Sequence, residues 1–484
     1  MKTKTVREFD KIICSDSIDN EDGYVCIEDE KAFAALERLS QSFRRLSSTF
    51  DEFLGNNYAA LNMDDDYSDN MRFCSIGRDN SHDKYIQIRN YVGVIKLTPN
   101  YQLEILPKIN LNKTGSTDDT EKEKEIFAKM LQSMYTFNFN VFDSARFSST
   151  EIQLLEIFIT IYLELVKKIV RRGLKSDYIG NEDNQKYYKG KLLVGKHIRY
   201  NAAHEERFYI YYDEYSLNRP ENRLIKTALI ALKHISKLQY NRNLINGLLA
   251  AFEGVEESFN YKADFKSINL DRMTKKQYQS VLKWTEIFLD YKSFSPYSGA
   301  HESVSLLFNM HDLFEAYVYQ QFRKQSVDLP WSVVKQGAGE KTYLFEKVEE
   351  NGEDLINRFL LKPDILVKQQ DGKCLAVLDT KWKRLNYNNE KYSRGITRED
   401  MYQMFAYSQK FGVNKIWLVY PRQPIAFWPR NDEGEPYTSV YHSDVNGEIV
   451  DVGISFVDME NPENSLSTII HEIEAIFPSI GPIE

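Results

Sequence analysis

The sequence predicts a multi-domain α/β protein, in which mixed β and α-helical N-terminal and middle regions precede a C-terminal α/β domain. The chain has 484 residues, more than a single hydrophobic core normally spans. Its hydrophobic content of 42% is sufficient for folded cores throughout. The apolar periodicity changes along the chain: a hairpin pattern in the first part gives way to helical spacing, and then to alternating helices and strands.

The composition favours a cytoplasmic protein without disulfides or a membrane anchor. No segment approaches the roughly 18 apolar residues of a membrane helix, and the N-terminus has no apolar signal region. The four cysteines are scattered and form no CxxC pair, which argues against a structural zinc site and a disulfide framework. We expect reduced thiols and no membrane partner.

Residues 1–145 are expected to form a mixed α/β domain. Its clearest element is a hairpin within 85–109, where two alternating apolar runs flank the turn-forming residues Thr98-Pro99-Asn100. The polar residues 111–125 that follow are interpreted as a linker.

Residues 146–295 are expected to form a mainly helical domain. The segment 151–172 has a broad apolar face, basic residues in its last turns and a glycine directly after it, as a helix C-terminus prefers. Segments 224–238 and 275–291 have the same character. Between the first two of these helical segments, the basic, tyrosine-rich stretch 186–216 is typical of a strand-rich insertion.

Residues 296–484 are expected to form an α/β sandwich around a mixed sheet. The predicted order is helix, three strands, helix and strand, at 304–324, 342–348, 358–369, 374–382, 398–411 and 414–421.

Charge is distributed unevenly in this last domain. Residues 358–430 contain 14 Lys or Arg against 6 Asp or Glu, whereas the residues after 430 contain 12 Asp or Glu and no Lys or Arg. The basic block permits a local site for a polyanion within an acidic protein, although such a block is also typical of an ordinary solvated face.

Two acidic residues lie at the ends of adjacent predicted strands. Asp364 follows Pro363 at the entry of one strand, and Asp379 ends the next. An Asp-Gly turn between the strands predicts a hairpin that brings the two carboxylates together. A divalent cation such as Mg²⁺ relieves their repulsion, with the Thr380 backbone carbonyl as a third oxygen ligand. The alternative is an ordinary hairpin with charged ends.

Lys381 lies two residues after Asp379 and therefore on the same face of the strand. A lysine beside a metal-bound water can orient the water, help to deprotonate it, or stabilise charge on an attacked phosphate. Asp-x-Lys alone is common by chance, but here it ends an apolar strand that pairs with a Pro-Asp strand. The combination indicates metal-assisted phosphodiester hydrolysis.

Two flanking helices offer further candidates. Thr397 is expected to cap one helix with Asp400 as its partner, and Gln403 and Tyr407 follow on the same face. They can hold phosphate or the nucleophilic water, or simply satisfy nearby backbone groups. Glu315, in the helix 304–324, is a candidate metal ligand or water-positioning residue, unless it lies on a helix surface.

These residues together resemble the PD-(D/E)xK nuclease superfamily, in the branch with a downstream QxxxY helix. The matching residues are Pro363-Asp364, Asp379-Thr380-Lys381, and Gln403 with Tyr407. The wider sequence resembles the McrC family, the nuclease subunit of McrBC-type, 5-methylcytosine-dependent restriction systems. The similar segments span most of the chain in the family's order, at 91–109, 189–201, 222–232, 312–318, 363–367, 378–383 and 401–408.

The resemblance implies a PD-(D/E)xK restriction-endonuclease-like C-terminal domain and a Mg²⁺-dependent DNA endonuclease activity, with Mn²⁺ able to substitute. Asp364, Asp379 and the Thr380 carbonyl would bind the metal. Lys381 would assist the nucleophile, and Gln403 and Tyr407 would support the site. Glu315 is a weaker transfer, since upstream acids vary in position across the superfamily.

The resemblance also implies two partners: a McrB-like AAA+ GTPase, which binds the GTP and which this subunit stimulates, and double-stranded modified DNA. The N-terminal and middle regions would contact the GTPase, and the stretch 186–216 is our candidate for the element that enters its ring. The chain itself has no GxxxxGK[ST] loop, since Gly339 is followed by Glu340 instead of lysine, so a nucleotide motor would be another chain.

Two alternatives remain. A non-catalytic assembly or GTPase-activating subunit would be free to lose Asp364, Asp379 and Lys381, and all three are present. A stand-alone nuclease of the QxxxY type would not need the long helical region that precedes the site.

Overall fold

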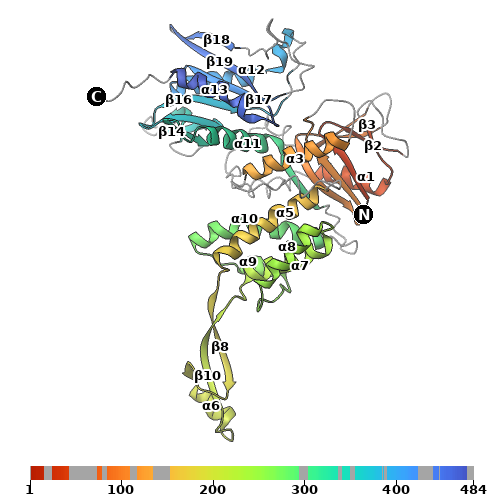
Figure 1. Cartoon of the computed structure of the whole chain (residues 1–484), viewed down its shortest axis with the longest axis vertical. Helices are drawn as coiled ribbons and strands as arrows, with labels where there is room; N and C mark the ends of the chain where they lie inside the picture. The colour runs from red at the N-terminus through yellow and green to blue at the C-terminus, as the bar shows by residue number, and fades with distance from the viewer. Residues whose placement is uncertain are drawn as a thin grey trace.

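The structure is a computed structural model that describes residues 2–15, 24–42, 73–78, 84–109, 117–134, 153–293, 304–335, 341–348, 355–383, 385, 390–422, 440–445 and 447–476. Figure 1 shows an elongated molecule with the C-terminal domain at one end, a helical region in the middle and a narrow arm at the other end. The predicted domain boundaries near residues 145 and 295 lie outside the described residues.

The N-terminal region contains two four-stranded sheets. The first has the order β1 (Lys2–Arg7), β7 (Tyr101–Leu106), β6 (Tyr91–Thr98) and β11 (Val304–Asn309). The second has the order β3 (Tyr24–Ile27), β2 (Lys11–Cys14), β5 (Tyr85–Ile88) and β4 (Cys74–Gly77). Helices α1 (Glu30–Ser42) and α3 (Thr117–Met134) pack on these strands. The predicted hairpin is confirmed, because β6 and β7 pair antiparallel.

The predicted helix 304–324 is wrong at its beginning. Residues 304–309 form strand β11, which pairs with β6 of the N-terminal sheet, and the helix starts only at Met310. Gly93 allows this pairing, because a Cβ atom at its position would lie 1.9 Å from the carbonyl oxygen of Leu306. The short apolar run Val304–Phe308 is compatible with either structure, and the edge of the distant sheet decides between them.

The interpretation of residues 111–125 as a linker is also wrong from Thr117 onward, where α3 begins. The Nε atom of Arg7 on β1 lies 3.0 and 2.9 Å from the two carboxylate oxygens of Glu123 on α3. Glu123 is thereby fully buried. A segment that is polar in sequence is a packed helix here because a long-range ion pair compensates its buried charge.

The middle region is helical, as predicted. Its helices are α5 (Leu154–Arg172), α7 (Pro220–Ile235), α8 (Gln239–Ala250), α9 (Tyr261–Ser267) and α10 (Arg272–Ser293). The first two residues of the predicted helix 151–172 lie outside the described residues. The rings of Phe158, Trp284 and Phe288 pack together in a core that continues into the N-terminal sheet.

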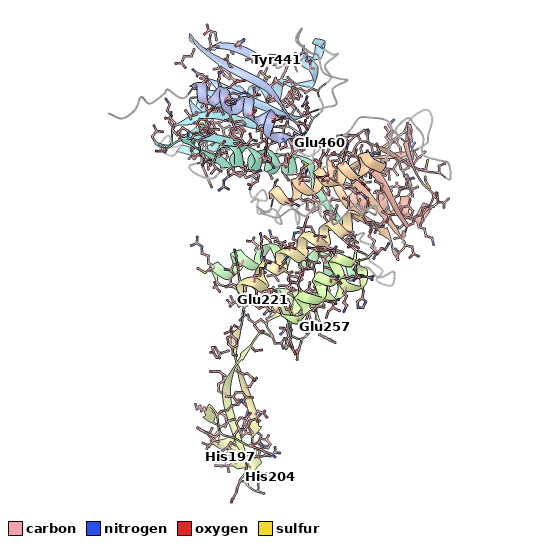
Figure 2. The ribbon with its side chains drawn as sticks, in the orientation of Figure 1. His197, His204, Glu221, Glu257, Tyr441 and Glu460 are labelled. Carbon is pink, nitrogen blue, oxygen red and sulfur yellow. The ribbon has the colours of Figure 1, made fainter. Side chains whose placement is uncertain are left out.

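A projecting arm interrupts these helices between Asp177 and Ser216 (Figure 1). Strands β8 (Asp177–Gln185) and β10 (Phe208–Ser216) pair antiparallel along it, and the short β9 (Lys191–Leu192) joins β10. The prediction of strands is correct but incomplete, because helix α6 (Val194–Asn201) lies near the tip. Figure 2 shows His197 and His204 at the end of the arm that is farthest from the helices.

The C-terminal domain is built on a six-stranded mixed sheet. Its order is β12 (Trp331–Lys335), β15 (Ile365–Gln369), β16 (Cys374–Thr380), β17 (Lys415–Pro421), β19 (Glu448–Val457) and β18 (Val440–Val445). Strands β13 (Tyr343–Val348) and β14 (Leu355–Leu360) form a separate hairpin that leads into β15.

Helices cover both faces of this sheet. Helices α11 (Met310–Gln325) and α13 (Pro462–Ile476) pack on one face in the large core, and α12 (Arg398–Phe411) packs on the other in a second core. A short 3₁₀ helix, η4 (Glu390–Gly395), precedes α12. The acidic tail after residue 430 contributes β18, β19 and α13 to the domain. Within the described part of the chain, no helix is both long and apolar enough to cross a bilayer.

Candidate active site

The structure brings Asp364 and Asp379 together as the sequence predicts. Strands β15 and β16 pair antiparallel with Ile365 opposite Leu378, so the next pair in this register is Asp364 opposite Asp379. Asp364 immediately precedes β15, and Asp379 is the penultimate residue of β16. The two carboxylates therefore lie at the same edge of the sheet.

Thr380 fixes the carboxylate of Asp364 against β16. Its backbone N–H and its hydroxyl both donate to Oδ2 of Asp364, at 2.7 and 2.6 Å. Burial raises the pKa of Asp364, and the two bonds from Thr380 oppose that rise. The side chain is therefore placed rigidly and is costly to ionise without a nearby positive charge.

Asp379 is almost completely buried, with 2% of its surface exposed. Burial, and then the negative charge of Asp364, raise its pKa to about 7. The two carboxylates repel each other at this buried edge of the sheet. A divalent cation bound between them would reduce that repulsion.

Lys381 directs its amine into this group of acids. Its Nζ lies 2.7 Å from Oδ2 of Asp379 and donates to Oε1 of Gln403 at 2.9 Å. Burial lowers its pKa, but the surrounding carboxylates, Asp379 foremost, outweigh this effect and the pKa is raised. The lysine is charged at neutral pH and is positioned to balance negative charge at the sheet edge.

Helix α12 begins with the predicted capping box. The Thr397 hydroxyl accepts from the backbone N–H of Asp400, and the Asp400 carboxylate accepts from the N–H of Thr397, both at 3.2 Å. The helix ends at Gly412, whose φ of 62° is the left-handed conformation of a C-cap. This fixes the phase of the helix and hence the direction of Gln403 and Tyr407.

Gln403 and Tyr407 lie on one face of α12, as predicted, and they continue the hydrogen bonding that begins at Lys381. The amide Nε2 of Gln403 donates to the Tyr407 hydroxyl at 2.8 Å, while its Oε1 accepts from Lys381. Tyr407 is buried in the second core. The chain of hydrogen bonds runs from the helix core to the lysine amine and orients it.

Glu315 approaches the same edge from α11 and is not a surface residue, since only 9% of it is exposed. Its Oε1 lies 3.5 Å from Nζ of Lys335 on β12. Burial, and then the charge of Asp364, raise its pKa well above the ordinary value. Asp364 is thus close enough to both acids for its charge to raise the pKa of Glu315 and of Asp379.

Three residues at the site were not predicted to belong to it. Lys383 donates to the Asp400 carboxylate at 2.8 Å, which ties the end of β16 to the start of α12. His311, one turn before Glu315 on α11, has its pKa lowered to about 4 by burial and by the charges of Lys381 and Lys383. Lys335 comes from a strand whose sequence carries no catalytic motif. Of these three residues, only His311 has a signal in the sequence, which is its i, i+4 spacing to Glu315.

The residues present fit a magnesium ion. Among the described residues, no group of three or more His, Cys, Asp and Glu side chains is arranged to hold a metal. The oxygen donors are instead two carboxylates, Asp364 and Asp379, and the Thr380 carbonyl beside them. Mg²⁺ is commonly bound by one or two carboxylates, with water and substrate phosphate filling its other positions.

The raised pKa of Asp379 has a consequence for stability that can be measured. Between about pH 4 and pH 7 the folded chain retains a proton that the unfolded chain has lost. The contribution of this group to the free energy of unfolding is therefore complete below about pH 4 and is lost as the pH rises through about 7. In EDTA, the melting temperature of the wild-type chain should fall relative to that of Asp379→Asn between about pH 4 and pH 7. A constant difference between the two melting curves would show that Asp379 titrates normally.

Tyr407→Phe tests the hydrogen-bond chain behind Lys381. The substitution keeps the buried ring and removes only the hydroxyl that Gln403 contacts. A single hydrogen bond contributes about 0.5–1.5 kcal/mol, so we expect DNA cleavage, if the site is a nuclease, to slow roughly two- to tenfold. Single-turnover rates would measure this, with Tyr402→Phe as the control, because Tyr402 is 70% exposed on the same helix. Equal cleavage rates for the two variants would show that the Tyr407 hydroxyl does not support the site.

Comparisons with known proteins bear directly on the family. A family model described as "McrBC 5-methylcytosine restriction system component" matches residues 86–421, more than two thirds of the chain. The chain belongs to this McrBC family. All six predicted site side chains of the McrBC chain, Glu315, Asp364, Asp379, Lys381, Gln403 and Tyr407, lie inside the matched span. A comparison with curated proteins yields no match.

A solved structure shares the fold of this McrBC-family chain. It is similar to a chain of the "refined half-complex from tetradecameric assembly of Thermococcus gammatolerans McrB AAA+ hexamers with bound McrC", with 17% identity and a TM-score of 0.61. That match covers 97% of this chain and 100% of the other. A chain of the "Thermococcus gammatolerans McrBC complex" has 20% identity and a TM-score of 0.44, over 66% of this chain and 86% of that one.

Proposed function

We propose that this McrBC-family chain is a McrC-type subunit: a Mg²⁺-dependent DNA endonuclease within a GTP-driven, modification-dependent restriction complex of the cytoplasm. The observation that carries the proposal is the edge at which Asp364 opposes Asp379 and Lys381 contacts both Asp379 and Gln403. This arrangement supports a PD-(D/E)xK site with a QxxxY helix, since Asp364, Asp379, Lys381 and Gln403 meet at one edge of the sheet.

In the proposed reaction, Asp364, Asp379 and the Thr380 carbonyl hold Mg²⁺, and Mn²⁺ can replace it. The metal, when bound, supplies Lewis-acid activation of water and of the phosphodiester. Lys381 stabilises negative charge on the attacked phosphate and orients the attacking water, and Gln403 holds the amine in place. Glu315, whose pKa is raised by the charge of Asp364, is suited to position water.

The proposed partner is a McrB-like AAA+ GTPase, which binds GTP and is stimulated by this subunit. The fold is shared over the full length of a chain from an assembly of McrB AAA+ hexamers with bound McrC. The substrate is modified double-stranded DNA, as the description of the family as a 5-methylcytosine restriction system component suggests.

The arm is the best candidate for the contact with the GTPase ring. It carries several large side chains that are more than half exposed: Tyr178, Tyr187, Tyr188, Val194, Ile198, Tyr200 and Tyr215. Exposed aromatic and aliphatic residues gathered on a projecting element are typical of a protein-binding surface. At its base, Arg219 pairs with both Asp177 and the buried Glu221, which anchors the arm to α7. Figure 2 shows Glu221 at this junction.

Reconstitution distinguishes the proposal from its alternatives. The chain would be incubated with methylated or unmethylated duplex DNA, with and without the GTPase from the same gene neighbourhood, in GTP and Mg²⁺. We expect cleavage only of methylated DNA and only with the partner present. Cleavage without the partner would favour a stand-alone nuclease. GTPase stimulation without any cleavage would favour a non-catalytic subunit.

A further inference from the structure

Trp382 lies between two lysines of the candidate site and points away from both. Lys381 and Lys383 extend toward α12, where they contact Gln403 and Asp400. The Trp382 ring lies on the opposite side and packs against Phe314 on α11, with ring centroids 5.4 Å apart. The backbone N–H of Lys383 donates to the carbonyl of Lys381 at 2.8 Å, so the three residues form one tight turn centred on Trp382. The position of the indole and the direction of the two lysines are therefore coupled.

The indole N–H of Trp382 reaches a buried acid of the N-terminal domain. Its Nε1 lies 3.3 Å from each carboxylate oxygen of Glu8, which is 374 residues away in sequence. Glu8 is fully buried and also accepts from the backbone N–H of Lys108 at 3.3 Å. A buried carboxylate depends strongly on such donors, so this contact is costly to lose.

Glu8 is itself held firmly within the N-terminal domain. Its backbone N–H donates to the carbonyl of Leu106 at 3.0 Å, and the preceding Arg7 is paired with Glu123 on α3. The following Phe9 has a φ of 65°, a left-handed conformation that is unfavourable for a bulky residue. Strained backbone of this kind persists only where the surroundings fix it, and it is found disproportionately at functional contacts.

A cavity of about 300 Å³ lies beside this contact, between the two domains. The N-terminal domain lines it with Glu8, Phe9, Lys108 and Ile109, and the C-terminal domain with Trp382, Lys383, Pro421 and Arg422. The domains are therefore not closely packed here, and the Glu8–Trp382 hydrogen bond crosses an incompletely filled junction.

We propose that the bond between Glu8 and Trp382 is a positioning link, by which the N-terminal domain holds residues 381–383 so that Lys381 stays directed at Asp379. Neither residue touches the substrate; both act through the lysine. The link makes the nuclease site dependent on the state of the N-terminal domain. The expected effect of the link on DNA cleavage rests on the proposed function. Its expected effect on the position of the Lys381 amine does not.

Variants of the full-length chain test the link. Trp382→Phe keeps a ring against Phe314 and removes the N–H, Glu8→Ala removes the acceptor, and Glu8→Gln retains one acceptor oxygen. In the complex with partner, GTP and Mg²⁺, we expect the first two to slow single-turnover cleavage roughly two- to tenfold, as loss of one hydrogen bond implies, without changing the half-saturating DNA concentration. Glu8→Gln should recover most of the rate. The double variant Glu8→Ala/Trp382→Phe should be no slower than the slower single variant.

A matched control separates positioning from stability. Glu104 is an equally buried acid of the same domain, which accepts from the Leu154 N–H and pairs with Lys124. Glu104→Gln should leave cleavage unchanged even if it lowers the melting temperature. A rate loss for Glu104→Gln as large as that for Trp382→Phe would overturn the link, and so would full activity of Trp382→Phe and Glu8→Ala.

The position of Lys381 can also be read without any cleavage. Acetylation of Lys381 by an N-hydroxysuccinimide ester, followed by mass spectrometry of its peptide, reports how firmly the amine is held. We expect roughly fivefold faster labelling in Trp382→Phe and Glu8→Ala than in the wild type or Glu104→Gln. Unchanged labelling would contradict the link. If the wild-type complex did not cut DNA, the proposed function would fail, and this measurement would still decide the link.

Discussion

Asparagine in place of Asp364 should abolish DNA cleavage by the reconstituted complex and leave stimulation of the partner's GTP hydrolysis unchanged. The substitution keeps the size of the side chain and a hydrogen-bond acceptor for Thr380, but it removes the charge that opposes Asp379 across β15 and β16. Loss of a metal ligand removes several kcal/mol of transition-state stabilisation, so we expect the rate to fall by at least about 1,000-fold. Plasmid linearisation and phosphate release would measure the two activities in the same mixture.

Asp371→Asn is the matched control for this substitution. Asp371 lies in the turn of the same hairpin, is exposed, and bonds only locally to the N–H of Lys373. This variant should cut DNA at the wild-type rate. If Asp364→Asn retained more than about half of that rate, the metal site would not be where we place it.

Removing the arm should produce the opposite pattern, with GTPase stimulation lost and the C-terminal domain intact. Asp177 and Ser216 face each other in the register of β8 and β10, so a two-residue Asn-Gly turn can replace residues 178–215 without stretching the chain. Because the exposed aromatic residues leave with the arm, we expect binding to the GTPase to weaken at least about 30-fold. Pull-down and GTP hydrolysis assays would measure this, with the melting temperature as the check on folding.

A single substitution tests the contact between the arm and the GTPase without removing the arm. Ile198 on α6 is 65% exposed and Ile449 on β19 is 59% exposed, at opposite ends of the molecule. Ile198→Asp should weaken partner binding, whereas Ile449→Asp should not. Equal behaviour of the two variants would show that the arm tip does not contact the GTPase.

The geometry of the candidate active site is largely predictable from sequence because most of its determinants are local. The Asp-Gly turn pairs β15 with β16, but the register shifts by one residue between Val367 and Lys368, and only with this shift does Asp364 lie opposite Asp379. The sequence therefore predicts the hairpin but not the irregularity that sets the final register. The capping box fixes the phase of α12, and helical spacing then places Gln403 and Tyr407 on one face. The roles of these residues rest on the resemblance to a nuclease family and stay predictions.

What the sequence does not reveal depends on contacts between distant segments. From the sequence alone, residues 304–309 look like the beginning of a helix. They form strand β11 because they pair with β6 of the distant N-terminal sheet. Helix α3 looks like a solvated linker until Arg7 buries Glu123. Trp382 has no visible partner, because Glu8 lies at the other end of the chain. In each case local preference is weak and tertiary packing decides the outcome.

The most direct test of the central claim is the metal dependence of cleavage in the reconstituted complex. Methylated duplex DNA, the partner GTPase and GTP would be held constant while Mg²⁺ is replaced by Mn²⁺, by Ca²⁺ or by EDTA. A two-carboxylate site with an adjacent lysine should cut with Mg²⁺ and Mn²⁺ and stop in EDTA, while GTP hydrolysis is followed separately in each mixture. Cleavage that continued in EDTA, or that was absent with every metal while GTP was hydrolysed normally, would contradict a metal-dependent nuclease centre at Asp364 and Asp379.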